Sequence, residues 1–433
     1  MSMHSQTPGR TDVVAFGDAP GDNDNPLLES VPAMPTLAEA MRLTEVQETQ
    51  DVTGWSAQEL IAHEAANSFV SEATRASVFI NAIAQVRSAY RDRDLRDPGY
   101  RDYAISANHF LHRSRDKRGR AILCRFSIAP GARPRGIVVA SPVGTGRRRL
   151  ADMVVSALGS EPRVTRVAAA TGFTEYLQLP VLRMTWPIDG KLSGFAQGFI
   201  GAFDTAFQTE YANNTRTPLF RERDIVPAIC ALGVASSLGL LIVERINMQD
   251  TCNSAADSTW NAVAQFTRTT GTPVLCLATP GATAVSLARL PGVVGDLTRT
   301  GLIEITPSRS AREKHWIAVC LAIFDRTMRL AGIASMPSWL PDAAYDLTLG
   351  YPGPLARVLT AIAIRVATLQ TPAFTPEIFT KYGRQALALD QPHLDAVRAF
   401  RGNITYKPSS LIRHGDWLSL SQLKSTHLLP EPR

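Results

Sequence analysis

One short stretch constrains the fold more than any other: IVVASPVGTGRRRL, residues 137–150. A strand-like apolar run leads into a loop with two glycines, and a helical pattern follows. Such a loop can point backbone N–H groups at a phosphate, and the helix N-terminus favours the anion. The usual pattern after a strand is G-x-x-x-x-G-K-[ST]. The second glycine is present, whereas a serine replaces the first and arginines replace the lysine and the hydroxyl residue. The candidate nucleotide-binding residues are Ser141, Gly144, Thr145, Gly146, Arg147 and Arg148.

Around this stretch, short β-rich runs alternate with helical ones. Runs such as GLLIVERI, TPVLCLAT and GLIEITP read as strands, and YLQLPVLRMTW (176–186) reads as another. Strands that alternate with helices predict an α/β domain with a parallel sheet. We expect a disordered tail at 1–36, a helical N-terminal region at 37–120, the α/β core at 121–308, a helical lid at 309–400 and a basic, irregular tail at 401–433. Ser56 and Glu59 have the spacing of a capping box.

Composition narrows the class of protein. The net charge is +6 and the pI about 9.2, mostly from arginine, which fits a polyanionic partner but also a genome biased toward arginine codons. The five cysteines form no CxxC pair, so neither a disulfide framework nor a zinc site is expected, and no other metal-ligand cluster is evident. No apolar run is long enough for a membrane span, and the N-terminus lacks the pattern of a secretory signal. We expect a soluble, cytoplasmic chain.

A second motif lies about one hundred residues after the first. In the run GLLIVERIN (239–247), four apolar residues are followed by an acidic residue, Glu244, and a positively charged residue, Arg245. ATPases of the AAA+ type end this strand in Asp-Glu, where the first acid positions Mg²⁺ and the second polarises water. Arg245 cannot act as a base, because a guanidinium stays protonated. A third strand ends in Thr279, where AAA+ proteins place a polar sensor; a threonine that closes a core strand is the alternative.

The order of these parts resembles the AAA+ regulators of heteromeric cut-and-paste transposons, the TnsC/TniB family. The resemblance runs from about 105 to 370. It rests on the segments LPVLRMTWPIDGKLSGFAQGFIGAFDTAFQTEY (179–211), LGLLIVERIN (238–247), PVLCLATPGA (273–282), LTRTGLIEI (297–305), EKHWIAVCLAIF (313–324) and TLGYPGPLARVL (348–359). The segment with P-x-D-G and the helix after it is the most specific of these. The resemblance implies an AAA+ P-loop core with a helical lid.

The resemblance also implies ATP as cofactor and double-stranded DNA as partner. Family members assemble with themselves into rings or filaments on DNA and connect a target-selecting protein to the transposase. An arginine from the neighbouring subunit reaches each nucleotide; Arg299 is the candidate, with Arg289 second. The candidate DNA-binding residues are Lys191, Arg216, Arg221 and Arg223. A solvated surface position is the alternative reading for each of them.

Three departures from the family pattern affect one reaction. Arg147 replaces a compact lysine charge, Arg148 replaces a magnesium ligand, and Arg245 replaces the water-orienting acid. The first hypothesis is therefore a DNA-associated adaptor with little Mg²⁺ binding and without ATP hydrolysis, which assembles with itself or a catalytic paralogue. The second is an active or slow ATPase with unorthodox chemistry. The third is a protein–protein scaffold with no nucleic-acid role.

Overall fold

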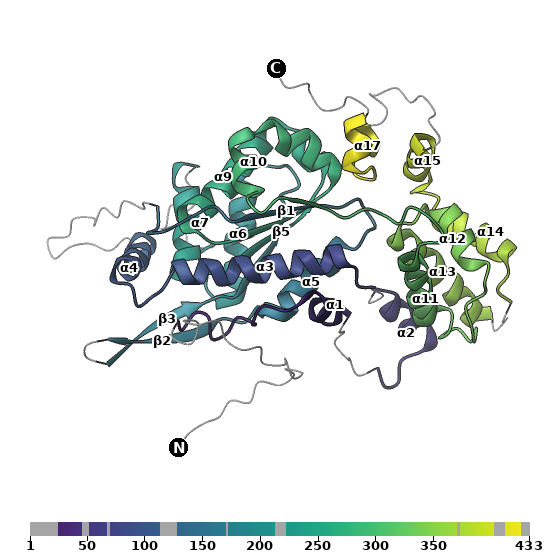
Figure 1. Cartoon of the computed structure of the whole chain (residues 1–433), viewed down its shortest axis with the longest axis horizontal. Helices are drawn as coiled ribbons and strands as arrows, with labels where there is room; N and C mark the ends of the chain where they lie inside the picture. Colours follow the sequence, from purple (N-terminus) through teal and green to yellow (C-terminus); the bar gives the residue numbers. More distant parts are fainter. Residues whose placement is uncertain are drawn as a thin grey trace.

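The computed structural model describes residues 25–45, 52–66, 70–112, 128–169, 172–212, 222–369, 373–401 and 412–425. The chain forms an α/β core and a helical lid that lie side by side (Figure 1). The core surrounds a central sheet, and most of the lid is built from helices between residues 314 and 401. The candidate functional site lies where the two parts meet.

The central sheet has five parallel strands in the order β4-β5-β6-β1-β7. Their bounds are β1 Gly136–Ala140, β4 Val181–Thr185, β5 Leu240–Ile246, β6 Val274–Ala278 and β7 Leu302–Glu304. Every residue of β1 and β6 is buried, as expected for strands covered on both faces. Because all strands run the same way, their carboxyl ends share one edge, where ligands of α/β sheets bind. The predicted α/β fold with a parallel sheet is confirmed.

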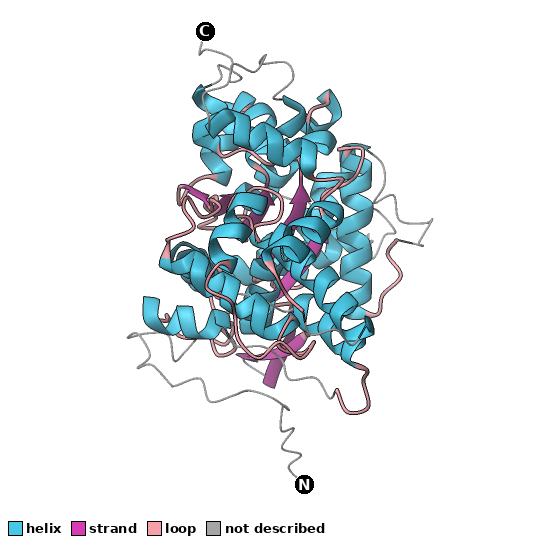
Figure 2. Ribbon diagram, turned by 90° about the vertical axis from the view of Figure 1, so that its right-hand side faces the viewer, coloured by secondary structure: helices cyan, strands magenta, loops and turns pink. Residues whose placement is uncertain are grey.

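Helices cover both faces of the sheet (Figure 2). They are α5 Arg147–Leu158, α6 Leu192–Phe207, α7 Glu222–Ala235, α8 Met248–Thr251, α9 Ser254–Thr270 and α10 Pro291–Leu297. A π-helical turn and a 3-10 turn, η1 Ala282–Ser286 and η2 Leu287–Arg289, follow β6. An antiparallel hairpin, β2 Arg163–Ala169 with β3 Gly172–Gln178, projects from the core. The core is therefore a parallel sheet flanked by helices, with further helical regions beside it.

The lid consists of α11 Lys314–Thr327, α12 Leu340–Thr348, α13 Pro352–Leu369, α14 Pro376–Ala386 and α15 Gln391–Arg401. By length and composition α13 is apolar enough to cross a membrane. Its side chains Leu355, Val358, Leu359 and Ile362 are fully buried in the lid, however, so α13 is the central helix of a helical domain.

Among the described residues before the sheet there are four helices: α1 Leu37–Glu45, α2 Ala57–Ala66, α3 Ala73–Asp92 and α4 Pro98–His112. The capping box predicted at the start of α2 is confirmed, because the Glu59 amide bonds to the Ser56 hydroxyl and the Glu59 carboxylate accepts from the Ser56 amide. These helices divide between the two parts of the molecule. The α3 helix packs on α5 and the sheet, whereas Ile61 of α2 is buried in the lid core.

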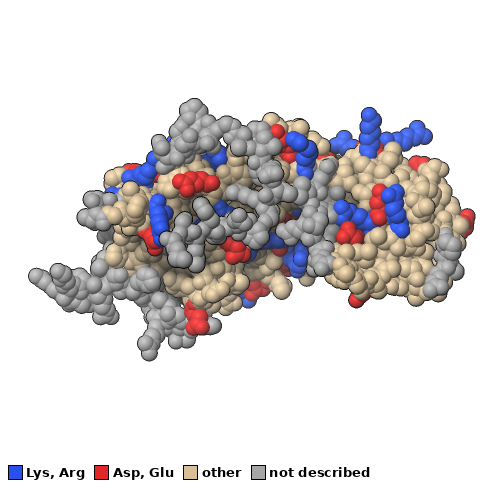
Figure 3. All heavy atoms as spheres, turned by 90° about the horizontal axis from the view of Figure 1, so that it is seen from below, with Lys and Arg blue, Asp and Glu red and all other residues tan. Residues whose placement is uncertain are grey.

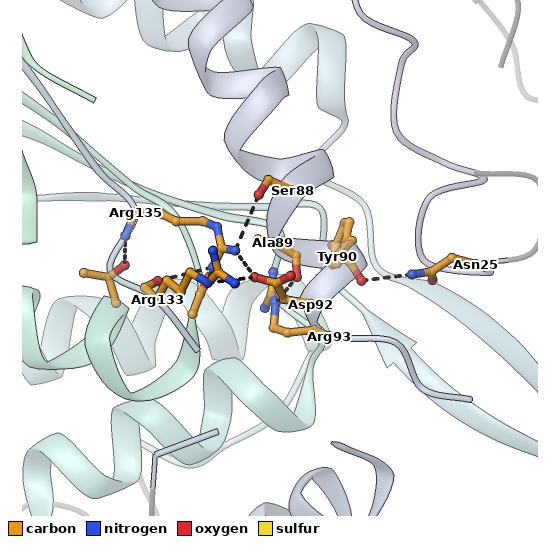
Figure 4. A network of polar contacts seen from close by, with 10 residues as sticks. Asn25, Ser88, Ala89, Tyr90, Asp92, Arg93, Arg133 and Arg135 are labelled. Carbon is orange, nitrogen blue, oxygen red and sulfur yellow. Dashed lines mark hydrogen bonds and ion pairs between the residues drawn. The ribbon is translucent and has the colours of Figure 1, made fainter. Parts of the chain in front are cut away.

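The terminal segments are more ordered than predicted. Residues 1–24 lie outside the described part, so their disorder stays a prediction. Residues 25–36 pack on the core instead of forming a tail, because Leu27 and Leu28 bury their side chains and the Asn25 side chain donates to the Tyr90 carbonyl, 2.9 Å away. Figure 4 shows this bond beside a charged network at the end of α3, in which Asp92 pairs with Arg135.

The last described segment, residues 412–425, also differs from the predicted irregular tail. It forms a 3-10 turn, η3 Ile412–His414, and a short helix, α17 Leu420–Ser425. Between them Trp417 and Leu418 are buried in the lid core. The segment packs there through its apolar side chains, which the overall basic composition of the tail did not reveal.

Candidate functional site

The predicted glycine loop joins β1 to α5 at the carboxyl edge of the sheet. Gly144 and Gly146 have φ of 80° and 93°, a backbone conformation that other residues adopt only with strain. The Ser141 and Thr145 hydroxyls bond to each other beneath the loop, and Thr145 also donates to the Pro142 carbonyl at 2.7 Å. These two hydroxyls therefore stabilise the loop from inside.

Two further elements, α3 and the start of α13, hold the loop in place. The buried Arg75 of α3 donates to the Thr145 carbonyl at 2.9 Å. The Gly353 amide at the start of α13 donates to the Gly144 carbonyl at 2.7 Å. A Cβ atom on Gly144 would lie 2.8 Å from the Pro354 ring, so only a glycine lets the lid approach this closely. The loop is thus part of the junction between core and lid.

A pocket of about 530 Å³ opens between the loop, the end of β5 and the lid. Its apolar wall comes from the N-terminal helices and the lid: Ala65, Val70, Val319, Ala322, Ile323, Pro352 and Ala356. Its polar end comes from the loop and its surroundings: Arg75, Gly144, Thr145, Gly146, Arg147, Arg148, Arg149, Asp152, Glu244 and Arg245. Five arginines and two acidic residues line this end, a net charge of +3. The pocket therefore favours a ligand with an apolar part and a strongly anionic part.

The structure brings Arg147 and Glu244 to the same pocket, as the two motifs predict. Arg147 is half-buried and donates to the Ile246 carbonyl at 3.4 Å. Burial lowers the pKa of Arg147, and the nearby carboxylates of Asp416 and Glu244 oppose that shift. Arg148 is exposed at the rim. Thus one arginine reaches inward from the loop while the next faces the opening.

Glu244 is held by an arginine that the motifs did not reveal. Arg183 of β4 donates to the Glu244 carboxylate at 2.8 Å and to Asp152 of α5 at 2.5 Å. Burial acts to lower the pKa of Arg183, but its hydrogen bonds to the two carboxylates raise it above the ordinary value. Glu244 is therefore part of a three-residue ion network at the pocket floor. A charged residue inside the apolar run VLRMT was the signal for it in the sequence.

Arg245 has an unusual backbone conformation. Its φ is 58°, and the pairing of β5 with β6 shifts register between Val243 and Ile246. Non-glycine residues in this region are uncommon and often mark functional sites. The bulge exposes Arg245 at the polar end of the pocket, so it places a cation where the AAA+ pattern has an acid.

Thr279 follows β6 and is fully buried. Its hydroxyl donates to Asp416 at 2.5 Å, and the same carboxylate accepts from the Met248 amide at 3.0 Å. Burial raises the pKa of Asp416, although these hydrogen bonds and Arg147 favour its charged form. Asp416 belongs to the C-terminal segment, and nothing in its local sequence indicates that it contacts the sheet edge.

The two candidate trans arginines differ in their surroundings. Arg299 is exposed in the turn before β7, next to the amino end of β1, whereas the pocket lies at the carboxyl end. Five residues of strand separate the two ends, about 16 Å. Arg299 therefore lies away from the pocket of its own chain. Arg289 pairs with Asp257 at 2.9 Å.

The candidate DNA-binding residues receive little support from the described residues. Lys191 is exposed but pairs with Asp189 at 3.1 Å. Arg216 and Arg221 lie outside the described residues, and Arg223 falls in the first turn of α7, where the side chains are not described. Figure 3 shows one face on which basic and acidic side chains are interspersed among the described residues.

The chemistry of the pocket does not suit a magnesium ion. The ligand position after Arg147 holds a guanidinium, and the Glu244 carboxylate is already bonded to Arg183. Mg²⁺ is held by oxygen ligands, and five nearby cations oppose it. Within the described ranges, no group of three or more His, Cys, Asp or Glu side chains could hold a metal.

Known proteins resemble this chain only distantly. No family model matches it. No curated protein matches it. Among solved structures, the ORC2 protein of Aeropyrum pernix (ADPNP–ADP complexes) is 12% identical with a TM-score of 0.39, covering 78% of this chain and 83% of that chain. The ORC1 protein of Aeropyrum pernix in complex with DNA is 13% identical with a TM-score of 0.36, covering 74% of each chain. A Walker-type ATPase of Pyrococcus abyssi is 10% identical with a TM-score of 0.35, covering 75% and 86%. Similarity this low does not transfer a function.

Proposed function

We propose that this chain binds a nucleotide such as ATP in the pocket between core and lid and holds it without hydrolysis, as part of a DNA-associated assembly. One observation carries the nucleotide part. A glycine loop at the start of α5, with an excess of three positive charges, meets an apolar wall of the lid in one pocket of about 530 Å³. A nucleotide has the matching shape, because an apolar base is linked to a polyanionic tail.

The residues present fit the two ends of such a ligand. The amides at the N-terminus of α5 and the guanidinium of Arg147 suit phosphate oxygens. Val319, Ile323 and Pro352 suit a base. Bound ATP would supply a triphosphate whose charge the arginines offset in place of a metal ion. This explains why Arg148 can occupy the magnesium-ligand position without loss of binding.

ATP hydrolysis needs a metal ion and a group that orients the attacking water, and the residues of this pocket are not suited to supply either. Phosphoryl transfer to water depends on metal charge and on an oriented water. Arg245 cannot accept a proton, and Glu244 is engaged by Arg183. We infer that the domain keeps its fold and interfaces while the reaction is lost.

The wider role follows from the resemblance to transposon regulators. We propose an adaptor that binds double-stranded DNA, self-associates and links a target-selecting protein to a transposase. The net charge of +6 and the position of Arg299 opposite its own pocket support this proposal. In a head-to-tail assembly, Arg299 of one copy would face the pocket of the next.

Titration with a fluorescent ATP analogue tests the nucleotide part. Binding should occur equally with MgCl₂ and with EDTA, and Arg147→Ala should weaken it at least tenfold. The matched control is Arg166→Ala, which removes an exposed arginine on the hairpin. Magnesium-dependent phosphate release that Glu244→Gln abolishes would instead establish the active ATPase.

A salt series with labelled duplex DNA tests the DNA part. Affinity should fall steeply with salt, since phosphate contacts release counterions. Absence of binding at low salt would favour a protein–protein scaffold.

A further inference from the structure

We propose that the segment 412–420 is a built-in competitor for the terminal phosphate of a bound nucleotide, with Asp416 in the place of that phosphate. The docked segment and a nucleoside triphosphate then exclude each other, whereas a diphosphate can bind beside the segment. This inference rests on the proposed nucleotide binding and adds its regulation.

Hydrogen-bond donors surround Asp416 on several sides. The Thr279 hydroxyl and the Met248 amide donate to its carboxylate at 2.5 and 3.0 Å. The Val143 amide, which belongs to the glycine loop, donates to its backbone carbonyl at 2.9 Å. Thr279 directly follows β6, Met248 begins α8 just after β5, and Val143 lies in the loop. Donors from three neighbouring elements thus converge on one residue, two of them on its carboxylate and one on its backbone carbonyl.

The positive charge of Arg147 lies close to the Asp416 carboxylate. Arg147 takes the position of the lysine that reaches the terminal phosphates in this type of loop. Burial lowers the pKa of Arg147, and the negative charge of Asp416 opposes that shift more than any other group does. A cation with converging hydrogen-bond donors makes an anion site, and here a carboxylate of the same chain fills it. A phosphate group would need the same donors and the same cation.

The docked segment packs closely against the loop after β6. A Cβ atom on Gly281 would lie 2.8 Å from the Gly415 carbonyl carbon and 3.1 Å from the Asp416 carboxylate. Little space therefore remains for a phosphate between the segment and the loop after β6 while the segment is docked.

The segment is also fastened to the lid. The Tyr351 hydroxyl bonds to the Trp417 carbonyl, and the ring of His393 stacks on the Trp417 indole at 5.3 Å. The Leu420 amide bonds to Glu304 of β7 at 2.7 Å. Release of Asp416 by a terminal phosphate would therefore loosen a contact between lid and core, which gives nucleotide binding a mechanical consequence.

The test compares ATP and ADP binding, both with EDTA, in the full chain and in Asp416→Asn. The variant keeps the shape of the side chain and removes its charge. We expect at least a tenfold gain in ATP affinity and less than a threefold change for ADP. Asp395→Asn, an exposed lid carboxylate, is the matched control and should change neither affinity. Thermal unfolding of each variant verifies that it is folded.

Hydrogen exchange gives a second readout that needs no variant. ATP should accelerate exchange of the amides of residues 412–425 in the unaltered chain, and ADP should not. If Asp416→Asn changes the affinities for ATP and ADP equally, or weakens ATP binding, then Asp416 does not compete with the terminal phosphate, although the proposed nucleotide binding still holds. Failure of both proteins to bind either nucleotide overturns the proposed function and this inference together.

Discussion

The ion network at the pocket floor gives a prediction with a calculable size. Arg183→Met removes the cation that joins Glu244 and Asp152 and leaves two carboxylates without their partner. The side chains of Arg183, Glu244 and Asp152 are 26%, 13% and 35% exposed, between a surface pair and a buried one. Breaking a buried pair costs about 3–5 kcal/mol and an exposed pair about 0.2–1 kcal/mol. We therefore expect a loss of about 2 kcal/mol in the free energy of unfolding.

A double-mutant cycle separates lost attraction from repulsion between the remaining charges. Glu244→Gln in the Arg183→Met background should restore about 1 kcal/mol, because one uncompensated charge is removed. The assay is denaturant unfolding followed by circular dichroism. Arg166→Met is the control, since Arg166 pairs with Glu175 on the exposed hairpin and should cost less than about 0.5 kcal/mol. Equal losses for Arg183→Met and Arg166→Met, or strictly additive effects of the two site mutations, would refute the reasoning.

Three further outcomes follow from contacts at the junction. Gly144→Ala should destabilise the chain by about 2–3 kcal/mol and weaken nucleotide binding, because its φ is 80° and a Cβ would meet Pro354; a calorimetric scan and a titration measure both effects. Arg75→Met should cost about 2 kcal/mol in urea unfolding, because it removes the buried donor to the loop carbonyl. Burial, and then His393, lower the pKa of His414, so the docked state favours the neutral ring. Docking of 412–425 should be unaffected by this group above pH about 6.5 and should weaken as pH falls below it, and unchanged tryptophan fluorescence between pH 7.5 and 5 would contradict this.

The local parts of the fold were predictable because each depends on a short pattern. The apolar run before the glycine loop predicts β1, and the serine and glutamate three residues apart predict the start of α2. One expected strand, residues 176–186, is divided instead: the turn at Leu179–Pro180 separates β3 from β4. The β3 part pairs with β2 in a hairpin, which a single apolar run does not distinguish from a longer sheet strand.

The composition of the pocket was predictable only in part. The loop and the acid of β5 were found because their spacing is characteristic. Asp416 was not, because it lies 137 residues from Thr279 and 168 from Met248, and only tertiary packing joins them. Arg75 was missed for the same reason, since a helical arginine is ordinarily a surface residue. The partners of buried charges are set by the fold and leave no local pattern.

The lid is discontinuous along the chain, and this affects how the molecule can form. Its core combines Ile61 of α2, helices from residues 314–401, and Trp417. When α2 joins the helices of residues 314–401, it closes a loop of about 250 residues that contains the whole central sheet. The chain loses the entropy of this closure before the contacts in the lid core can form. We therefore expect the lid to consolidate after the sheet, and a fragment limited to residues 309–400 to expose apolar surface and aggregate.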